Sequence, residues 1–221
     1  MRRPLQSRQA RWAVATASWL TRQRVQPNTI SLASVAFAAL AGGCLVLSGL
    51  DLPLPRGLLL LLAAGMIQLR LVCNLLDGMV AIEGGLKTPS GELYNDVPDR
   101  ISDPLILVGA GYGIVWGVWG ITLGWLAAVL AILTAYVRVL GVSAGTQHYF
   151  LGPMAKQHRM AALTAACVAG ALEAILLQPY TGWSVGIALV VIVMGSAATV
   201  VRRLRRIAAD LEARAQVSEA R

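Results

Sequence analysis

Residues 105–137 read LILVGAGYGIVWGVWGITLGWLAAVLAILTAYV, a long run without a single charged side chain. One straight helix over this run would be about 50 Å long at 1.5 Å per residue, well beyond the hydrocarbon core of a bilayer. Its middle, Trp116-Gly117-Val118-Trp119-Gly120, has glycines that interrupt a helix and tryptophans that favour a membrane interface. The run therefore predicts two membrane-spanning helices joined by a turn.

The composition of the whole chain agrees with a membrane location. Of its 221 residues, 57% are hydrophobic and 14% are charged, whereas soluble domains carry about 25% charged residues. About 20 apolar residues are enough to cross a bilayer as a helix, and four more segments qualify: 30–50, 57–74, 160–178 and 182–201. The sequence thus predicts an all-α integral membrane protein with six transmembrane helices and leaves no room for a soluble catalytic domain.

Arginines mark the two ends of the chain. Six precede Pro27 and six follow Val201, and the formal net charge is +8. Cytoplasmic segments of membrane proteins carry the excess of Lys and Arg, so both ends are expected in the cytoplasm, which requires an even number of spans. Because the arginines stand at the ends of apolar segments, the expected partner is an anionic membrane lipid surface and not nucleic acid.

The segment before the first span has a different pattern. Apolar residues from Leu5 to Leu20 recur at roughly helical spacing with arginines off that stripe, which is typical of an amphipathic helix lying in the membrane interface. The expected organisation is therefore an interfacial helix at residues 1–26, a six-helix membrane domain at 27–201 and a basic cytoplasmic tail at 202–221.

Acidic residues are concentrated in one part of the chain. Carboxylates at a membrane boundary are costly unless they are paired or coordinate a metal, and this stretch has only Lys87 and Arg100 as cations. Carboxylate oxygens suit Mg²⁺, Mn²⁺ or Ca²⁺, while three cysteines without paired spacing do not suggest zinc. Of the eleven Asp and Glu residues, six lie between residues 77 and 103: Asp77, Glu83, Glu92, Asp96, Asp99 and Asp103.

Two sets of these polar side chains each share one helical face. The first set stands one turn apart and the second at successive intervals of four residues: Asn74 and Asp77, then Asn95, Asp99 and Asp103. Glycine and proline residues between 84 and 91 interrupt the helix and let the two faces come together. This pattern predicts a divalent-cation site at the cytoplasmic face, with a solvated acidic loop as the alternative.

The same residues resemble the signature of the CDP-alcohol phosphatidyltransferases, D-x-x-D-G-x-x-A-R, eight residues, then G-x-x-x-D-x-x-x-D. Here the frame reads Asn74-Leu-Leu-Asp77-Gly78-Met-Val-Ala81-Ile82, eight residues, then Gly91-Glu-Leu-Tyr-Asn95-Asp-Val-Pro-Asp99, and every interval matches. Pro27-Asn28-Thr29-Ile30-Ser31 is similar to the P-N-x-I-T/S start of the family's first span. The resemblance covers Pro27 to about Val201.

The resemblance implies an enzyme of phospholipid synthesis that transfers the phosphatidyl group of CDP-diacylglycerol to the hydroxyl of a small alcohol or phospho-alcohol and releases CMP. It implies one or two Mg²⁺ or Mn²⁺ ions at four positions of the frame, and Asp99 falls on the position of the family's general base. Gly78, Ala81 and Gly91 fall on nucleotide-binding positions. The implied metal positions are Asn74, Asp77, Asn95 and Asp99.

Three cations are expected on the same membrane face as the acidic stretch: Arg138 at the inner end of the fourth span, and Lys156 and Arg159 before the fifth. We expect them to bind an anionic acceptor or the donor phosphate; ordinary positive-inside flanking is the alternative. Glu173 lies inside the fifth span, where a protonated carboxyl, a contact between the subunits of a homodimer or a polar crevice are all open.

Departures from the signature leave several alternatives. With two Asn at acidic positions and Ile82 in place of Arg, the site could hold one ion, could be shifted by one turn onto Asp96 and Asp103, or could belong to a catalytically silent lipid- or nucleotide-binding membrane protein. The signature also serves enzymes that transfer phosphocholine or phosphoethanolamine from a CDP-alcohol. A divalent-ion transporter is the third functional alternative.

The expected location is a bacterial inner membrane with both termini cytoplasmic.

Overall fold

The computed structural model of the protein describes residues 10–83, 91–177 and 179–219. All regular structure in these residues is helical, which confirms the predicted all-α class. The helices are α1 (Arg11–Arg22), α2 (Pro27–Ser48), α3 (Arg56–Glu83), α4 (Gly91–Gly113), α5 (Val118–Ser143), α6 (Lys156–Leu176) and α7 (Trp183–Glu219).

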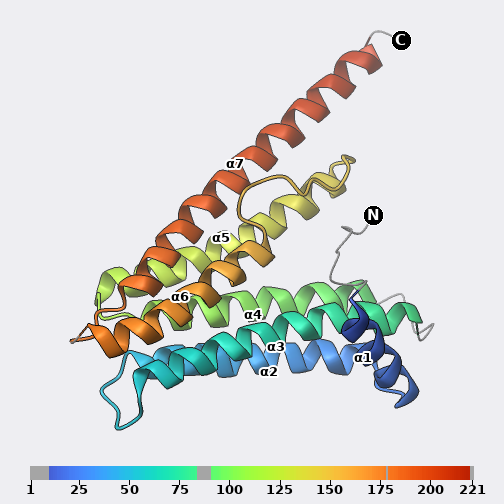
Figure 1. The fold of residues 1–221 in the computed structure, drawn as a ribbon. Helices are drawn as coiled ribbons and strands as arrows, with labels where there is room; N and C mark the ends of the chain where they lie inside the picture. The colour runs from blue at the N-terminus through green and yellow to red at the C-terminus, as the bar shows by residue number, and fades with distance from the viewer. Residues whose placement is uncertain (1–9, 84–90, 178, 220–221) are drawn as a thin grey trace.

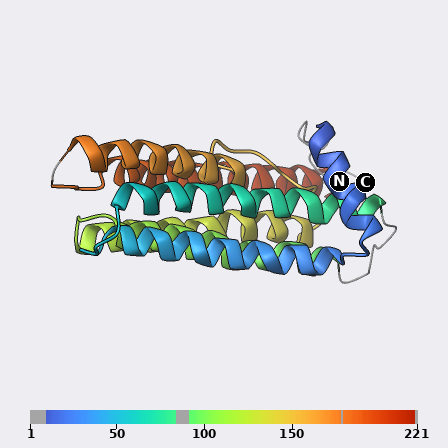
Figure 2. The ribbon, with the colours of Figure 1, turned by 60° about the horizontal axis from the view of Figure 1, so that its bottom comes forward.

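Helices α2, α3 and α4 run side by side, α5, α6 and α7 are inclined to them, and α1 lies across the end of the bundle toward which the C-terminal part of α7 extends (Figures 1 and 2). Ala13 and Ala17 of α1 are fully buried in a cluster with residues of α3, including Leu76 and Val80. Trp12 is half exposed, as tryptophans at a membrane interface usually are. The described part of the predicted interfacial helix thus begins at Arg11, and residues 1–9 lie outside the described residues.

Five helices are long and apolar enough to cross a membrane, namely α2, α3, α5, α6 and α7. The chain is therefore a multi-pass helical membrane protein. Helix α4 packs against α2 and α5, but its first half carries charged residues from Asp96 to Asp103, and it does not meet the same criterion. The count of six spans accordingly stays a prediction.

The predicted interruption of residues 105–137 is confirmed. Helix α4 ends at Gly113 and α5 begins at Val118, and Gly117 before it has a φ of +58°, a left-handed conformation that glycine adopts without strain. The second predicted span is longer than expected, because α3 continues to Glu83 instead of ending near Asn74. Residues 202–219 continue α7 as one helix, seen as the red extension in Figure 1.

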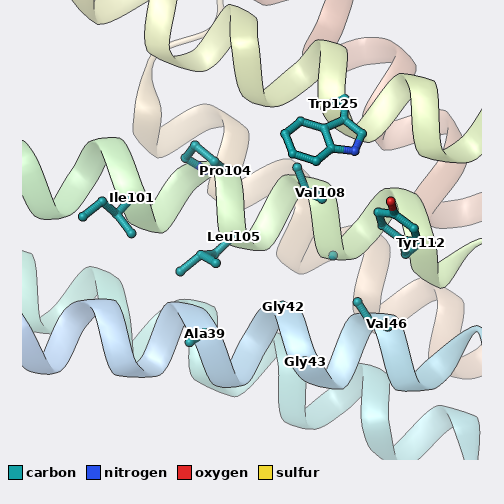
Figure 3. A pocket seen from close by; sticks show the side chains of 11 residues that line it. Ala39, Gly42, Gly43, Val46, Ile101, Pro104, Leu105, Val108, Tyr112 and Trp125 are labelled. Carbon is teal, nitrogen blue, oxygen red and sulfur yellow. The ribbon is translucent and has the colours of Figure 1, made fainter.

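Two faces of helix α4 have different surroundings. One face lines an apolar pocket of about 610 Å³ between α2, α4 and α5, with Ile101 toward one end and Tyr112 toward the other (Figure 3). Asp99 and Asp103 are buried and contact side chains of α3 and α6. The fold therefore directs the carboxylates of α4 into the bundle.

Helices α2 and α4 approach each other closely at a pair of glycines. A Cβ atom on Gly109 would lie 2.6 Å from the carbonyl oxygen of Gly42, whereas one on Gly43 would meet no atom within 4 Å. We expect Gly109→Ala to force the helices apart and to cost about 1–3 kcal/mol of stability, as overpacked cores do. Thermal unfolding in detergent measures this, with Gly43→Ala as the matched control. An equal midpoint for the two variants would show that the contact is not tight.

Candidate active site

A network of buried ion pairs joins three helices of the bundle. It lies near the end where α1 packs on α3, since Asp77 follows directly on Leu76 of that contact. The charged members come from α3, α4 and α6 and are almost completely shielded from solvent, except for the lysine. The ion-paired members are Arg70, Asp99, Asp103, Lys156 and Arg159, and Asp77 lies near enough to interact electrostatically with Lys156 and Asp99.

Asp99 is surrounded by three hydrogen-bond donors. Its Oδ1 accepts from Nη2 of Arg70 at 3.0 Å and from Nδ2 of Asn74 at 2.9 Å. Its Oδ2 accepts from Nζ of Lys156 at 2.5 Å. The two helical faces identified in the sequence therefore do meet, and two cations offset the cost of burying this carboxylate.

Asp103, one turn further along α4, is held by two arginines. Nη2 of Arg70 donates to Oδ1 at 2.6 Å, and Nη2 of Arg159 donates to Oδ2 at 2.8 Å. Arg159 is itself buried, and its Nη1 also donates to Oγ1 of Thr134 at 3.3 Å and to the carbonyl oxygen of Met154 at 3.2 Å. Both carboxylate oxygens of Asp103 are thus engaged within the protein.

Asp77 differs from the other two carboxylates because one of its oxygens has no hydrogen-bond partner in the part of the chain that the structure describes. The side chain is buried, with a 4% exposed fraction for the residue, and Oδ2 accepts from Oγ of Ser31 at 2.7 Å. Oδ1 has no hydrogen-bond partner within residues 10–83, 91–177 and 179–219. Asp77 also lies near enough to Lys156 and Asp99 to interact with both charges. A buried carboxylate oxygen without a partner is costly, so a bound cation would compensate it.

Asp96 lies at the edge of the network and is more accessible. Its Oδ1 accepts from Nη2 of Arg138 at 3.1 Å and from Nη2 of Arg100 at 3.4 Å. The guanidinium of Arg138 also lies over the ring of Phe150, with its Cζ atom 5.7 Å from the ring centroid. Ion pairs this exposed contribute little stability, so both Asp96 and Arg138 could exchange partners.

The remaining predicted site residues fall around this network. Gly78 and Ala81 follow Asp77 on α3, and Gly91 is the first residue of α4. The side chain of Asn95 lies outside the described residues, as do those of Glu83 and Glu92. Across residues 10–83, 91–177 and 179–219, no group of three or more His, Cys, Asp or Glu side chains is placed to hold a metal ion.

Sequence reasoning missed the partners of two site residues. Arg70 is not among the predicted site residues, but it has no exposed surface and bridges two carboxylates of α4. Its position four residues before Asn74, on the same helical face, was the available signal. Ser31 belongs to the Pro27–Ser31 motif, yet nothing in the motif indicated its hydrogen bond to Asp77.

The side chain of Glu173 caps the N-terminus of the following helix, α7, which explains how its charge is accommodated. Its carboxylate accepts hydrogen bonds from the backbone nitrogens of Trp183 and Ser184, both at 2.9 Å, from Oγ of Ser184 at 2.8 Å and from Oγ1 of Thr181 at 3.2 Å. An acidic side chain at a helix N-terminus satisfies free N–H groups and complements the helix dipole. The charge expected to be expensive in the fifth span is therefore compensated at the start of α7.

Comparison with solved structures identifies the fold. The chain is similar to phosphatidylinositol phosphate synthase (PgsA1) of Mycobacterium tuberculosis, a member of the CDP-alcohol phosphatidyltransferase family. Against the structure with CDP-DAG bound, the TM-score is 0.70 at 21% identity, covering 90% of this chain and 94% of that one. Against the complex with manganese and citrate, it is 0.69 at 20% identity, covering 88% of each chain. The fold implied by the sequence resemblance is thus confirmed.

Sequence comparisons cover less of the chain than the structural comparisons. No profile of a known protein family matches the chain. The inner membrane protein YnbA of Escherichia coli K12 is 35% identical over 88 residues, which are 40% of this chain and 41% of that protein. The chain thus matches less than half the length of this relative, and the relative adds support for a membrane protein only.

Proposed function

We propose that the chain is a phosphotransferase of phospholipid synthesis. It transfers the phosphatidyl group of CDP-diacylglycerol to the hydroxyl of a small polar acceptor and releases CMP, in a bacterial inner membrane with both chain ends in the cytoplasm. The observation that carries this proposal is the pair of buried carboxylates, Asp77 and Asp99, at facing positions of α3 and α4. They sit in the fold of a synthase whose solved structure has CDP-DAG bound.

The residues present fit a divalent ion at Asp77. Its Oδ1 is buried and has no hydrogen-bond partner among the described residues, and carboxylate oxygens are the ligands that Mg²⁺ and Mn²⁺ prefer. We assign Asn74, Asn95 and Asp99 as the other metal positions of the frame. Such an ion would stabilise the negative charge of the donor pyrophosphate during transfer.

Asp99 is the proposed general base. In the transfer, the acceptor oxygen forms a bond to the phosphorus of the phosphatidyl group, the bond from that phosphorus to the CMP oxygen breaks, and the acceptor proton goes to Asp99. The Oδ2 edge of Asp99 is contacted by Lys156, whose side chain is 29% exposed. A substrate phosphate that draws Lys156 away would free this edge for the acceptor hydroxyl.

Phosphate groups would be bound by the accessible cations. Arg138 and Lys156 are both partly exposed, and each is paired with a carboxylate that a phosphate could replace. Arg159 is buried and pairs with Asp103. Gly78, Ala81 and Gly91 lack bulky side chains and would let the cytidine nucleotide approach the backbone.

Lys156→Met tests the assignment of the phosphate-binding lysine. We expect a higher KM for the substrates and a lower kcat, because the variant loses a cation that contacts both phosphate and Asp99. The melting temperature should change little, since the side chain is partly exposed. Steady-state kinetics of CMP release together with thermal unfolding measure both effects. An unchanged KM would remove Lys156 from the substrate site.

Donor and acceptor are tested in one assay. The purified chain in detergent with Mg²⁺ or Mn²⁺ receives radiolabelled CDP-diacylglycerol and a panel of alcohols and phospho-alcohols, and lipid products are separated. A parallel arm supplies CDP-choline or CDP-ethanolamine with diacylglycerol. Product only in the first arm supports the proposal, while product only in the second identifies a CDP-alcohol enzyme of the choline or ethanolamine type.

One observation favours a second candidate, a catalytically silent nucleotide- or lipid-binding membrane protein. Asp99 already accepts hydrogen bonds from three side chains, two of them cationic, so both of its oxygens are occupied by protein donors. Binding of CDP-diacylglycerol without CMP release with any acceptor or metal would support this candidate over the transferase.

A further inference from the structure

Arg70 lies at the centre of the candidate site and has no exposed surface. One of its nitrogens, Nη2, donates to Asp99 at 3.0 Å and to Asp103 at 2.6 Å. A guanidinium stays protonated at any physiological pH. The charge between these two carboxylates is therefore permanent and does not depend on a bound ion.

The buried network is formally neutral without a metal. Asp99 and Asp103 pair with Arg70, Lys156 and Arg159 across α3, α4 and α6. With the nearby Asp77, which interacts electrostatically with Lys156 and Asp99, the set contains three carboxylates and three cations. Two divalent ions would add four positive charges to this set, and nearby cations would repel them.

The carboxylate oxygens show where one ion can still be accepted. All four oxygens of Asp99 and Asp103 accept a hydrogen bond from a nitrogen. Asn74 directs its Nδ2 at Asp99, so it acts as a donor to that carboxylate. Among the described residues, Oδ1 of Asp77 is the one oxygen of these three carboxylates that has no hydrogen-bond partner.

We propose that Arg70 takes the place of one divalent ion, so that the site binds a single ion, at Asp77. Arg70 is a positioning residue: it fixes Asp99 and Asp103 relative to α3 and supplies there the positive charge that a second ion would bring. The inference rests on the proposed function, because it describes how the same site works with two carboxylates fewer than the family signature.

Ion content tests the proposal directly. Mn²⁺ bound per chain is measured on the purified full chain in detergent by equilibrium dialysis and by electron paramagnetic resonance. We expect one ion for the wild type and none for Asp77→Asn. Asn74→Asp should still bind one ion, because Arg70 remains, and the double variant Asn74→Asp with Arg70→Met should bind two.

Further variants separate charge from structure. Asn74→Asp combined with Arg70→Lys retains a buried cation and should bind one ion. Mn²⁺ should raise the unfolding temperature of the double variant Asn74→Asp with Arg70→Met more than that of the wild type. If this variant can be purified only with Mn²⁺ present, the bound ions are still counted on that preparation. Two ions or none in the wild type, or one ion in the double variant with Met, would overturn the proposal.

Catalysis is scored separately from ion content. CMP release from CDP-diacylglycerol is assayed on the same preparations. A wild type that binds one ion but releases no CMP contradicts the proposed function and leaves the role of Arg70 standing. A wild type that releases CMP with two bound ions contradicts the role of Arg70 and leaves the function standing.

Discussion

Asp99→Asn should reduce CMP release from CDP-diacylglycerol by about 10²–10⁴-fold, the contribution usual for a general base. An amide of the same shape cannot take the proton of the acceptor hydroxyl. The fold should survive, because Arg70 keeps its shorter ion pair, 2.6 Å to Asp103. Kinetics of CMP release and a thermal unfolding curve are measured on the same preparation.

The matched control for Asp99→Asn is Asp51→Asn, the same change at an exposed residue of the loop between α2 and α3. It should retain wild-type activity. Undiminished CMP release by Asp99→Asn would show that Asp99 is not the base and would remove the central residue of the proposed chemistry.

Asp103→Asn should have the largest effect on stability. It leaves two almost fully buried guanidinium groups, those of Arg70 and Arg159, with one carboxylate fewer between them. Breaking a buried pair by removing one partner typically costs about 3–5 kcal/mol, because the remaining charge stays desolvated. Thermal unfolding in detergent should therefore show a strongly lowered midpoint or failure to purify as folded protein.

Asp96→Asn is the matched control on the same helix. The side chain of Asp96 is 46% exposed, and exposed pairs contribute about 0–1 kcal/mol, so its midpoint should stay near that of the wild type. Equal midpoints for the two variants would mean that the Asp103 network does not stabilise the fold. Comparing Asp103→Asn with Asp99→Asn separates Asp99, which we assign to chemistry, from Asp103, which we assign to structure.

Local spacing was sufficient to predict much of the fold. The uncharged length of residues 105–137 required an interruption, and glycine and tryptophan marked its place, which the structure confirms. Intervals of three and four placed Asn74 with Asp77 and Asp99 with Asp103 on shared faces. Helical periodicity reports which side chains share a face of one helix, and for that reason these predictions did not need the tertiary structure.

Pairing between distant helices could not be predicted in the same way. Arg70 contacts residues 29 and 33 positions away, and no periodicity connects them. A lone arginine in an apolar segment indicates an unknown partner, but only packing of α3 on α4 shows which one. The same holds for Glu173, whose partners at the start of α7 are brought close by the turn after α6. The extent of α3 past Asn74 was missed because Asn74, Asp77 and Gly78 interrupt the apolar run there.

The most direct test of the account is the balance of products from wild-type protein. CDP-diacylglycerol labelled in both the cytidine and the lipid part is incubated with the purified chain, an acceptor and Mn²⁺, with a chelator in a parallel sample. The account predicts CMP and a new phospholipid in equal amounts with Mn²⁺ and neither with the chelator. Intact CDP-diacylglycerol in every sample, whatever the acceptor, would contradict it.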